Sequence, residues 1–258
     1  MEFCITSKED NETLLIKEKI KNELIKAGLN YNSEAPELVI SIGGDGTFLQ
    51  AVSKYFKIKP IFASINYGNL GYLCEYKSSE LKDFISDLSS LNHLERKIHL
   101  LEIKYNGKKK YALNEVRVES NDGHTLVFDV YVNGTYLETL KSDGCCVSTS
   151  IGSSGMCRSL GGAIVDNEIE LIEFVENAPI LNRTYVSIRS PFVFAKDKVI
   201  TIKNIKNKNF SIYYDCISDS IDELKGDIEV KLSNKYIRVF KNPRNNYIRK
   251  THEAFINE

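Results

Sequence analysis

The sequence predicts an α/β N-terminal domain with a parallel, Rossmann-like sheet, followed by an all-β C-terminal domain of packed sheets. The first part of this prediction depends on apolar strands that alternate with helix-length segments up to about residue 91. The second part depends on the short strand-like runs after Glu95, which turn signals separate and no further long helix interrupts. We expect domains at 1–94 and 95–258, with the C-terminal tail returning to the first domain.

In the first domain, the expected elements follow the order β-α-β-α-β-α. Ser7 followed by Asp10 resembles a capping box and predicts a helix of about eighteen residues, which Gly28 ends. The other expected elements are strands at 2–6, 38–42 and 60–65, a helix through about Tyr55, and a helix from Ser78 or Ser79 to about Leu91. In parallel sheets of this kind, ligands bind beyond the carboxyl ends of the strands.

In the second domain, tight turns are expected to connect the strands. Asn106-Gly107 and Asn133-Gly134 are typical of type I′ hairpin turns. Thr125 to Val132 alternates apolar and polar residues, as a half-buried strand does. Strands are expected at 97–105, 109–119, 124–132, 135–140, 144–149, 168–175, 185–195, 198–205, 209–217, 227–232 and 236–240, with a short helix near 153–160.

The composition is ordinary for a soluble globular protein, and the chain is expected to be cytoplasmic. The net charge is −1, so no overall field attracts the chain to nucleic acid or to a membrane. The N-terminal residues do not resemble a signal peptide, and no apolar run approaches a membrane span. The cysteines lack the paired spacing of a structural zinc site, so we expect buried, reduced thiols. The basic tail at 231–250 is read as a solvated face rather than as an anion site.

The glycine-rich stretch after the second long strand suggests phosphate chemistry. Gly43, Gly44 and Gly46 let the backbone approach a ligand closely, and the helix that follows offers unpaired N–H groups. Asp45 stands among these glycines, where a carboxylate can handle a proton or hold a metal. The alternative is a tight turn in which Asp45 bonds to its own backbone. A second loop with glycines, Asn66 to Leu73, follows the next strand and is expected at the same sheet edge.

An ordered set of motifs resembles the NAD kinase family. The set begins with Gly43-Gly44-Asp45-Gly46-Thr47, then Asn66-x-Gly68-x-Leu70-Gly71-Tyr72-Leu73, and then Asn114-Glu115. It continues with Asp143-Gly144, Ser159-Leu160-Gly161-Gly162-Ala163-Ile164-Val165, Ala178-Pro179 and Ser190-Pro191. One segment departs from the family, because Ser150 to Met156 lacks the usual proline, both threonines, the alanine and the tyrosine. Where the family has the tyrosine, Met156 cannot provide an aromatic ring to stack on a base, an interaction worth about 1–3 kcal/mol.

The resemblance implies transfer of a γ-phosphoryl group to the 2′-hydroxyl of the adenosine ribose of NAD, with Asp45 as general base. Gly43, Gly44 and Gly46 would approach the phosphates, and Mg²⁺ would be held mainly by phosphate oxygens. The resemblance places the following residues at the substrates: Tyr72, Asn114, Glu115, Lys141, Asp143, Ser154, Gly155, Met156, Ser159 and Ala178. It also implies a homodimer or homotetramer. ATP, another triphosphate and polyphosphate stay open as donors, and NAD and NADH as acceptors.

Two other functions stay open from the sequence. A lipid or other small-alcohol kinase of the same fold would also carry the GGDG loop, although it gives no reason for Asn114-Glu115 followed by Asp143-Gly144. A dinucleotide-binding regulatory protein with impaired catalysis would explain the altered stretch from Ser150 to Met156. Formation of NADP from ATP, Mg²⁺ and NAD distinguishes the kinase from both.

Overall fold

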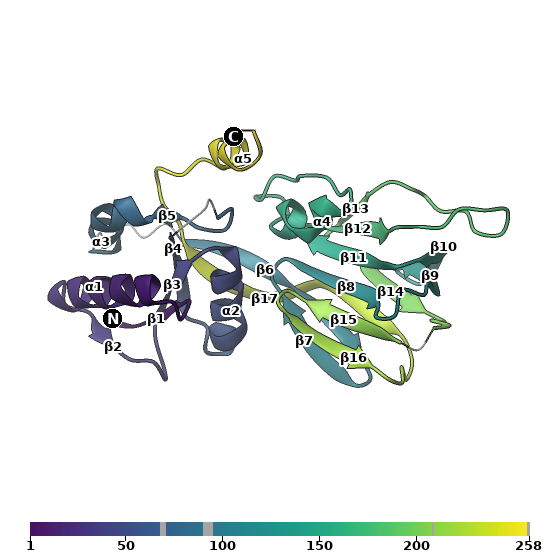
Figure 1. Cartoon of the computed structure of the whole chain (residues 1–258), viewed down its shortest axis with the longest axis horizontal. Coiled ribbons are helices and arrows are strands. Elements are labelled where there is room, and N and C mark those ends of the chain that lie inside the picture. The colour runs from purple at the N-terminus through teal and green to yellow at the C-terminus, as the bar shows by residue number, and fades with distance from the viewer. Residues whose placement is uncertain (68–70, 90–94, 208, 257–258) are drawn as a thin grey trace. The chain divides into compact units, whose positions relative to one another are not determined.

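A computed structural model describes residues 1–67, 71–89, 95–207 and 209–256 (Figure 1). The chain divides into two compact units, one formed by Met1–Ile98 with Tyr236–Glu258 and the other by His99–Lys235. Strands β6 (Glu95–Tyr105) and β17 (Ile228–Phe240) carry the chain between these units. Of the motif residues that carry the family resemblance, Gly68 and Leu70 lie outside the described residues, as does Leu91, the expected end of a helix.

The first unit is a parallel sheet with helices. Its strands run in the order β17–β4–β3–β1–β2, and β5 pairs with β4. The elements are β1 (Glu2–Ser7), α1 (Asn11–Lys26), β2 (Asn30–Tyr31), β3 (Leu38–Gly43), α2 (Asp45–Tyr55), β4 (Ile61–Asn66), β5 (Tyr76–Lys77), α3 (Leu81–Ser89) and α5 (Tyr247–Phe255). Short 3₁₀ turns at Phe56–Ile58 and Ser78–Glu80 lead out of α2 and into α3. The predicted parallel α/β domain is confirmed.

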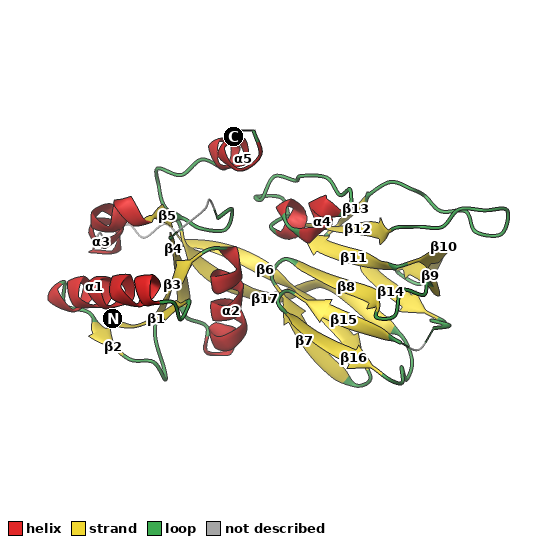
Figure 2. Ribbon diagram, viewed as in Figure 1, coloured by secondary structure: helices red, strands yellow, loops and turns green. Residues whose placement is uncertain are grey.

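The two faces of this sheet are covered by different helices. Leu24 of α1 and Phe84 of α3 pack into one core with Ile40 of β3. Because side chains alternate along a strand, the other face carries Phe62 of β4, which meets Phe48 of α2 with ring centroids 6.2 Å apart. Figure 2 shows α2 on the opposite side of the strands from α1.

Two helix predictions in this unit are corrected. The N-cap of α1 is Asp10, whose carboxylate accepts the Thr13 N–H at 2.8 Å, and Ser7 belongs to β1 instead. The prediction also left out α5, a short helix of nine residues in the C-terminal tail. Asn246 caps α5 by accepting N–H groups of its first turn, which the sequence search for apolar periodicity overlooked.

The second unit consists of antiparallel strands. One sheet has the order β13–β12–β11–β8–β15–β16, and a second group contains β10–β9–β14–β17 and the β6–β7 hairpin. The bounds are β7 (Lys108–Ala112), β8 (Glu115–Ser120), β9 (Leu126–Val132), β10 (Thr135–Ser142), β11 (Gly144–Thr149), β12 (Leu171–Asn177), β13 (Phe192–Ala195), β14 (Val199–Lys203), β15 (Phe210–Tyr214) and β16 (Ile217–Ile221), with a 3₁₀ turn at Gly152–Ser154 and α4 at Met156–Ser159. The predicted β domain is confirmed.

One hydrophobic core joins the inner faces of these sheets. Phe128 and Val130 of β9 contribute to it together with Val118 of β8 and Ile212 of β15. At the predicted hairpin turn, Asn106 and Gly107 have φ angles of 47° and 72°, the positive values that a type I′ turn requires. Asn133 and Gly134 have φ angles of 49° and 78°, so the second hairpin turn is of the same kind.

Several strand predictions in the second unit are corrected. The run at 109–119 is two strands, β7 and β8, which Leu113 and Asn114 separate. The run at 209–217 ends at Tyr214, and β16 begins after a turn at Asp215. Only β13 forms within 185–195, whereas 227–232 and 236–240 belong to one strand, β17. The two missed turns interrupt runs of strand-forming residues for only two positions each, which is why the sequence pattern did not reveal them.

The cysteines are all free thiols, and their burial corrects one prediction. Cys4, Cys74, Cys145, Cys146 and Cys157 are buried as expected, but Cys216 is exposed. Among the described residues, no helix combines the length and apolar character that crossing a membrane requires.

Candidate active site

Asp45 lies where β3 ends and α2 begins. Gly43 pairs with Asn66 across β3 and β4, so both glycine loops leave the sheet at the same edge, as predicted. The Asp45 carboxylate accepts the Tyr72 N–H at 3.0 Å and the Leu73 N–H at 2.9 Å. Asp45 is therefore held by the second loop rather than by its own backbone, which removes the reason to read it as a simple turn residue.

The glycines around Asp45 differ in how much space surrounds them. Gly44 is the N-cap of α2 and Gly46 is exposed in its first turn, and a Cβ at either would meet nothing within 4 Å. Backbone N–H groups are therefore open to a ligand here. Gly43 is buried, and its position would bring a Cβ to 2.5 Å from the Thr47 Oγ1.

Gly71 lets the second loop close on the Asp45 carboxylate. A Cβ at Gly71 would lie 2.9 Å from the Asp45 Oδ1 and 2.8 Å from the Cys74 Sγ. Both distances are shorter than van der Waals contact, so a side chain here must displace the thiol and the carboxylate or shift the loop itself.

Gly71→Ala is expected to lower turnover, because the added methyl group would lie 2.9 Å from the Asp45 Oδ1 and disturb the position of the carboxylate. The measurement is kcat for the NADP formation that the family resemblance implies, with the thermal melting temperature beside it. The double variant Gly71→Ala/Cys74→Ala removes the sulfur contact and leaves the carboxylate contact. Recovery of turnover in the double variant would mean that Cys74, not Asp45, was displaced.

Tyr72 is engaged by α5. Its hydroxyl lies 3.0 Å from the Thr251 Oγ1, and its ring lies 5.7 Å from the ring of Tyr247 and 5.8 Å from that of Phe255. The resemblance places Tyr72 at the substrates, but these contacts favour packing inside the protein for its ring.

The second unit holds Asn114 and Glu115 in a tight turn between β7 and β8. The Asp215 carboxylate accepts the Leu113 N–H at 2.6 Å and the Asn114 N–H at 2.7 Å. The Asp215 N–H in turn donates to the Glu115 carbonyl at 3.1 Å. Asp215 has a φ angle of 52°, a left-handed conformation that Asp adopts more readily than most residues. Hydrogen bonds in both directions between residues 113–115 and the distant Asp215 therefore hold this turn.

The side chains of Asn114 and Glu115 are buried and incompletely bonded. They are 9% and 7% exposed, and within the described part of the chain the Asn114 Oδ1 and the Glu115 Oε2 find no hydrogen-bond partner. Buried polar atoms are normally paired, so these two are the ones a ligand would satisfy. A Cβ at Gly155 would lie 3.5 Å from the Glu115 Oε2 and 3.6 Å from the Asn114 Nδ2, which brings three predicted site residues together.

Gly152 makes this arrangement possible. A Cβ at Gly152 would lie 2.2 Å from the Asn114 carbonyl oxygen, so only glycine allows the two backbones to approach so closely. Thr149 adds a second link, because its Oγ1 donates to the Leu113 carbonyl at 2.8 Å. The departure of Ser150–Met156 from the family pattern therefore leaves a well-formed turn beside Asn114.

Burial changes the acidity of the carboxyl groups here. It raises the pKa of Glu115 to about 7, with the nearby Asp215 charge adding to the effect and Arg117 opposing it. Burial also raises the pKa of Asp215 to about 6, against the backbone N–H groups that bond to it. For Asp45, burial raises the pKa, and the Leu73 and Tyr72 N–H groups and the Lys250 charge oppose the increase.

The raised pKa of Glu115 predicts that the stability of the protein depends on pH. Its pKa is raised from 4.5 to about 7 on folding, so the native state binds more protons between these values and its free energy of unfolding falls as pH rises through them. Glu115→Gln is expected to flatten this decrease, because glutamine does not ionise. Urea midpoints measured from pH 4.5 to 8 check the prediction. Parallel curves for the variant and the parent would contradict it.

Three further predicted residues meet at the turn between β10 and β11. The Asp143 N–H donates to the Asn177 carbonyl at 3.0 Å, next to Ala178. The Lys141 carbonyl accepts the Ile180 N–H at 2.7 Å, and its ammonium lies 5.6 Å from the centre of the Tyr185 ring. Asp143 and Ala178 are exposed, so both are open to a ligand.

The remaining predicted residues lie around α4. Met156 begins this helix and is 39% exposed, Ser159 ends it, and Ser154 precedes it in the 3₁₀ turn. Ser153, which is buried, donates to the Ser150 carbonyl at 2.7 Å and accepts the Val165 N–H at 3.0 Å. Met156 can therefore offer an apolar surface, and Ser159 lies three residues further along the same helix.

Sequence reasoning missed Asp215 and Lys250. Asp215 lay within an expected strand at 209–217, and only the turn dipeptide Asp215-Cys216 could have indicated otherwise. Lys250 lay within the tail that was read as a solvated face, yet its side chain is 13% exposed and pairs with Glu75 at 3.1 Å. The cap signal of Asn246 before an amphipathic stretch was the available clue.

Comparisons with known proteins identify the family. A model of the ATP-NAD kinase N-terminal domain matches residues 4–95, and one of the ATP-NAD kinase C-terminal domain matches residues 113–242. The chain belongs to the NAD kinase family. The predicted resemblance is thereby confirmed, and with it the prediction of a phosphotransferase. These matches favour an NAD kinase over the lipid-kinase alternative.

Relatives and solved structures agree with this assignment. NAD kinase 1 of Listeria monocytogenes is 34% identical over 266 residues, with 100% of each chain covered. NAD kinase 1 of Oceanobacillus iheyensis is 32% identical, with 100% of this chain and 99% of that protein covered. A crystal structure of yeast NADH kinase complexed with NADH has a TM-score of 0.85 and 21% identity, covering 100% of this chain and 89% of that one. An NAD kinase from Archaeoglobus fulgidus in complex with ATP has a TM-score of 0.81 and 21% identity, covering 98% of this chain and 99% of that one.

Proposed function

We propose that this member of the NAD kinase family transfers the γ-phosphoryl group of ATP to the 2′-hydroxyl of the adenosine ribose of NAD, with Asp45 as general base. The observation that carries the proposal is the placement of the Asp45 carboxylate, which two backbone N–H groups hold at the amide-rich start of α2. Membership of the family supplies the reaction class.

The roles follow from what such a reaction needs. Phosphoryl transfer requires positioning of the reactants and stabilisation of negative charge more than covalent help from the protein. The open N–H groups around Gly44 and Gly46 suit phosphate oxygens. Asp45 would orient the 2′-hydroxyl and accept its proton as the new P–O bond forms and the bond to the leaving diphosphate breaks. The raised pKa of Asp45 makes it a stronger base than an exposed aspartate.

The second unit would hold the acceptor. Asn114 and Glu115 carry the buried oxygens without partners, and ribose hydroxyls are donors that would satisfy both. Asp143 would accept hydrogen bonds from further hydroxyls, with Lys141 close by in β10. Gly155 lies beside Asn114 and Glu115, and Met156 follows it at the start of α4. Ala178 lies beside Asp143 at the opposite end of β11. The solved structure in complex with NADH supports a dinucleotide as the ligand.

Mg²⁺ would accompany the nucleotide. Among the described residues, no group of three His, Cys, Asp or Glu side chains is arranged to hold a metal ion. Phosphate oxygens are ligands that Mg²⁺ prefers, so the donor itself would supply most of the coordination and the ion would screen its charge. The relative in complex with ATP supports ATP as that donor.

The test is direct. The purified chain is incubated with ATP, Mg²⁺ and NAD, and NADP is measured with a NADP-specific dehydrogenase. NADP formation that depends on all three supports the proposal, and the same assay with polyphosphate or NADH defines donor and acceptor preference. Binding of NAD without any NADP would instead support the regulatory protein that the altered Ser150–Met156 stretch suggested.

We also propose a cytoplasmic location and a homodimer or homotetramer. The family resemblance supports the oligomer, and the free cysteine thiols support a reducing compartment such as the cytoplasm. Light scattering coupled to size-exclusion chromatography measures the oligomeric state, and cell fractionation tests the location.

A further inference from the structure

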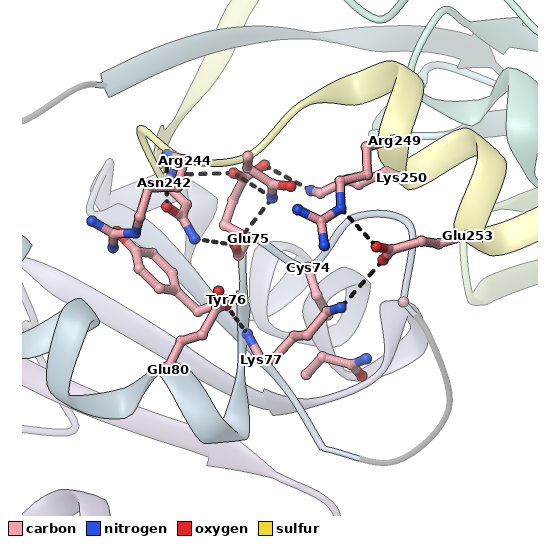
Figure 3. A pocket seen from close by; sticks show the side chains of 13 residues that line it. Cys74, Glu75, Tyr76, Lys77, Glu80, Asn242, Arg244, Arg249, Lys250 and Glu253 are labelled. Atoms are coloured by element: carbon pink, nitrogen blue, oxygen red, sulfur yellow. Dashed lines mark hydrogen bonds and ion pairs between the residues drawn. The ribbon is translucent and has the colours of Figure 1, made fainter.

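A pocket of about 80 Å³ in the first unit joins α5 to the segment that holds Asp45 (Figure 3). Gly71 and Cys74 line it from the loop after β4, and Lys250 and Glu253 line it from α5. Gly71 is the residue that closes on the Asp45 carboxylate, and the Cys74 Sγ lies 4.0 Å from the Asp45 Oδ1. The pocket therefore borders the group proposed above as the general base.

Glu75 is the anchor of the C-terminal tail. Its carboxylate accepts the Lys250 ammonium at 3.1 Å and the Asn242 N–H at 3.2 Å, and its carbonyl accepts the Asn245 Nδ2 at 3.0 Å. Lys250 and Glu75 are 13% and 17% exposed, so this ion pair is largely removed from water. A charged pair in such a place is screened weakly and acts on its neighbours.

Further contacts fix α5 along the same segment. The Lys77 ammonium pairs with Glu253 at 3.2 Å, in a position that is much more exposed to water. Tyr72 contacts Thr251 through its hydroxyl and Tyr247 and Phe255 through its ring. Tyr72 and its neighbour Leu73 also donate the two N–H groups that hold Asp45. One face of α5 thus packs on the residues that position the carboxylate.

We propose that α5 is a positioning element for the general base, in which Lys250, anchored on Glu75, places a positive charge in the pocket that Gly71 and Cys74 also line, next to the segment that holds Asp45. The proposal depends on the function proposed above. It assigns the C-terminal tail a part in catalysis without contact between Lys250 and either substrate. The charge favours the ionised form of Asp45, which is the form that accepts a proton.

The groups that face Asp45 act in different directions. Burial raises the pKa of Asp45, while the Leu73 and Tyr72 N–H groups and Lys250 lower it. The Cys74 thiol stays protonated, because burial and the Asp45 charge raise its pKa to about 12. Glu75 is compensated by Lys250. Loss of the Lys250 charge should therefore raise the pKa of Asp45.

The test is the pH profile of kcat/KM for NADP formation. Lys250→Gln keeps an N–H donor for Glu75 but removes the charge, so its acid limb is expected to move upward by about one pH unit. At a pH below that limb, kcat/KM then falls up to about tenfold, and Lys250→Arg restores the parent profile. The matched control is Lys77→Gln, which removes an α5 ion pair with Glu253 and leaves the acid limb in place.

Removing one partner of a buried pair can unfold a protein, since the other charge is left uncompensated. The double variant Lys250→Gln/Glu75→Gln avoids this and is expected to show an upward shift smaller than that of Lys250→Gln, because the negative charge of Glu75 is removed with the positive charge of Lys250. The proposal would be overturned if the acid limb of the kcat/KM profile stayed in place in both Lys250→Gln and the double variant. An equal shift of that limb in Lys77→Gln would overturn it as well. Parent activity and its loss in Asp45→Asn are measured first, because failure there refutes the proposed function instead.

Discussion

Asp45→Asn is expected to lower kcat for NADP formation by about 10²- to 10⁴-fold, the usual contribution of a general base. Asparagine has nearly the shape of aspartate, and its single oxygen can still accept one of the N–H groups of Tyr72 and Leu73. It cannot accept the proton of the attacking hydroxyl. The loss should appear in kcat more than in KM, because the carboxylate acts in the transition state.

The measurement is steady-state turnover with thermal melting and NAD titration beside it. Asp83→Asn is the matched control, since Asp83 is an exposed aspartate on α3 of the same unit. The control is expected to keep the parent kcat. If Asp45→Asn kept near-normal turnover with its fold intact, Asp45 would be a structural residue and the proposed mechanism would be wrong.

Asp215→Ala is expected to lower the free energy of unfolding by about 2 to 6 kcal/mol and to raise KM for NAD. Alanine leaves the Leu113 and Asn114 N–H groups without their acceptor, and each buried donor without a partner costs about 1–3 kcal/mol. The turn that presents Asn114 and Glu115 then loses its support, so the acceptor site loosens. We expect kcat to change less than KM, because Asp215 positions other residues and contacts no reacting atom.

Urea unfolding and NADP kinetics check this prediction together. Asp222→Ala serves as the control, since Asp222 is exposed after β16 in the same unit and its removal changes the net charge equally. Asp215→Asn should lie between the parent and Asp215→Ala, because it retains one acceptor oxygen. An unchanged KM in a destabilised Asp215→Ala would show that the turn keeps its shape without Asp215.

Local signals made much of the fold predictable. The strand at Leu38–Gly43, the glycine loop and the helix at Asp45–Tyr55 follow one another within a few residues, so propensity and turn chemistry act on the same short segment. The hairpins at Asn106-Gly107 and Asn133-Gly134 are equally local. The meeting of both glycine loops at one sheet edge followed from the rule for parallel strands.

Features that depend on distant contacts were not predictable. The bonds from Leu113 and Asn114 to Asp215 join residues about 100 positions apart, so nothing near either segment reveals them. Strand β15 ends before Asp215, where the hydrogen bonds to Leu113 and Asn114 hold the chain in a turn. The local sequence pattern does not mark this end. Helix α5 is short, and most stability of such a helix comes from packing rather than propensity, so its sequence alone was a weak signal.

For this protein, the sequence by itself determined the fold class, the family and the identity of Asp45, Asn114 and Glu115 as candidate site residues. These depend on residue types in a fixed order, which a chain carries before it folds. Only the tertiary structure decided what holds those residues: the Tyr72 and Leu73 N–H groups and α5 for Asp45, and Asp215 with Gly152 for the Asn114–Glu115 turn. The physical reason is that hydrogen bonds, charge and burial act between neighbours in space, and these neighbours are far apart along the chain.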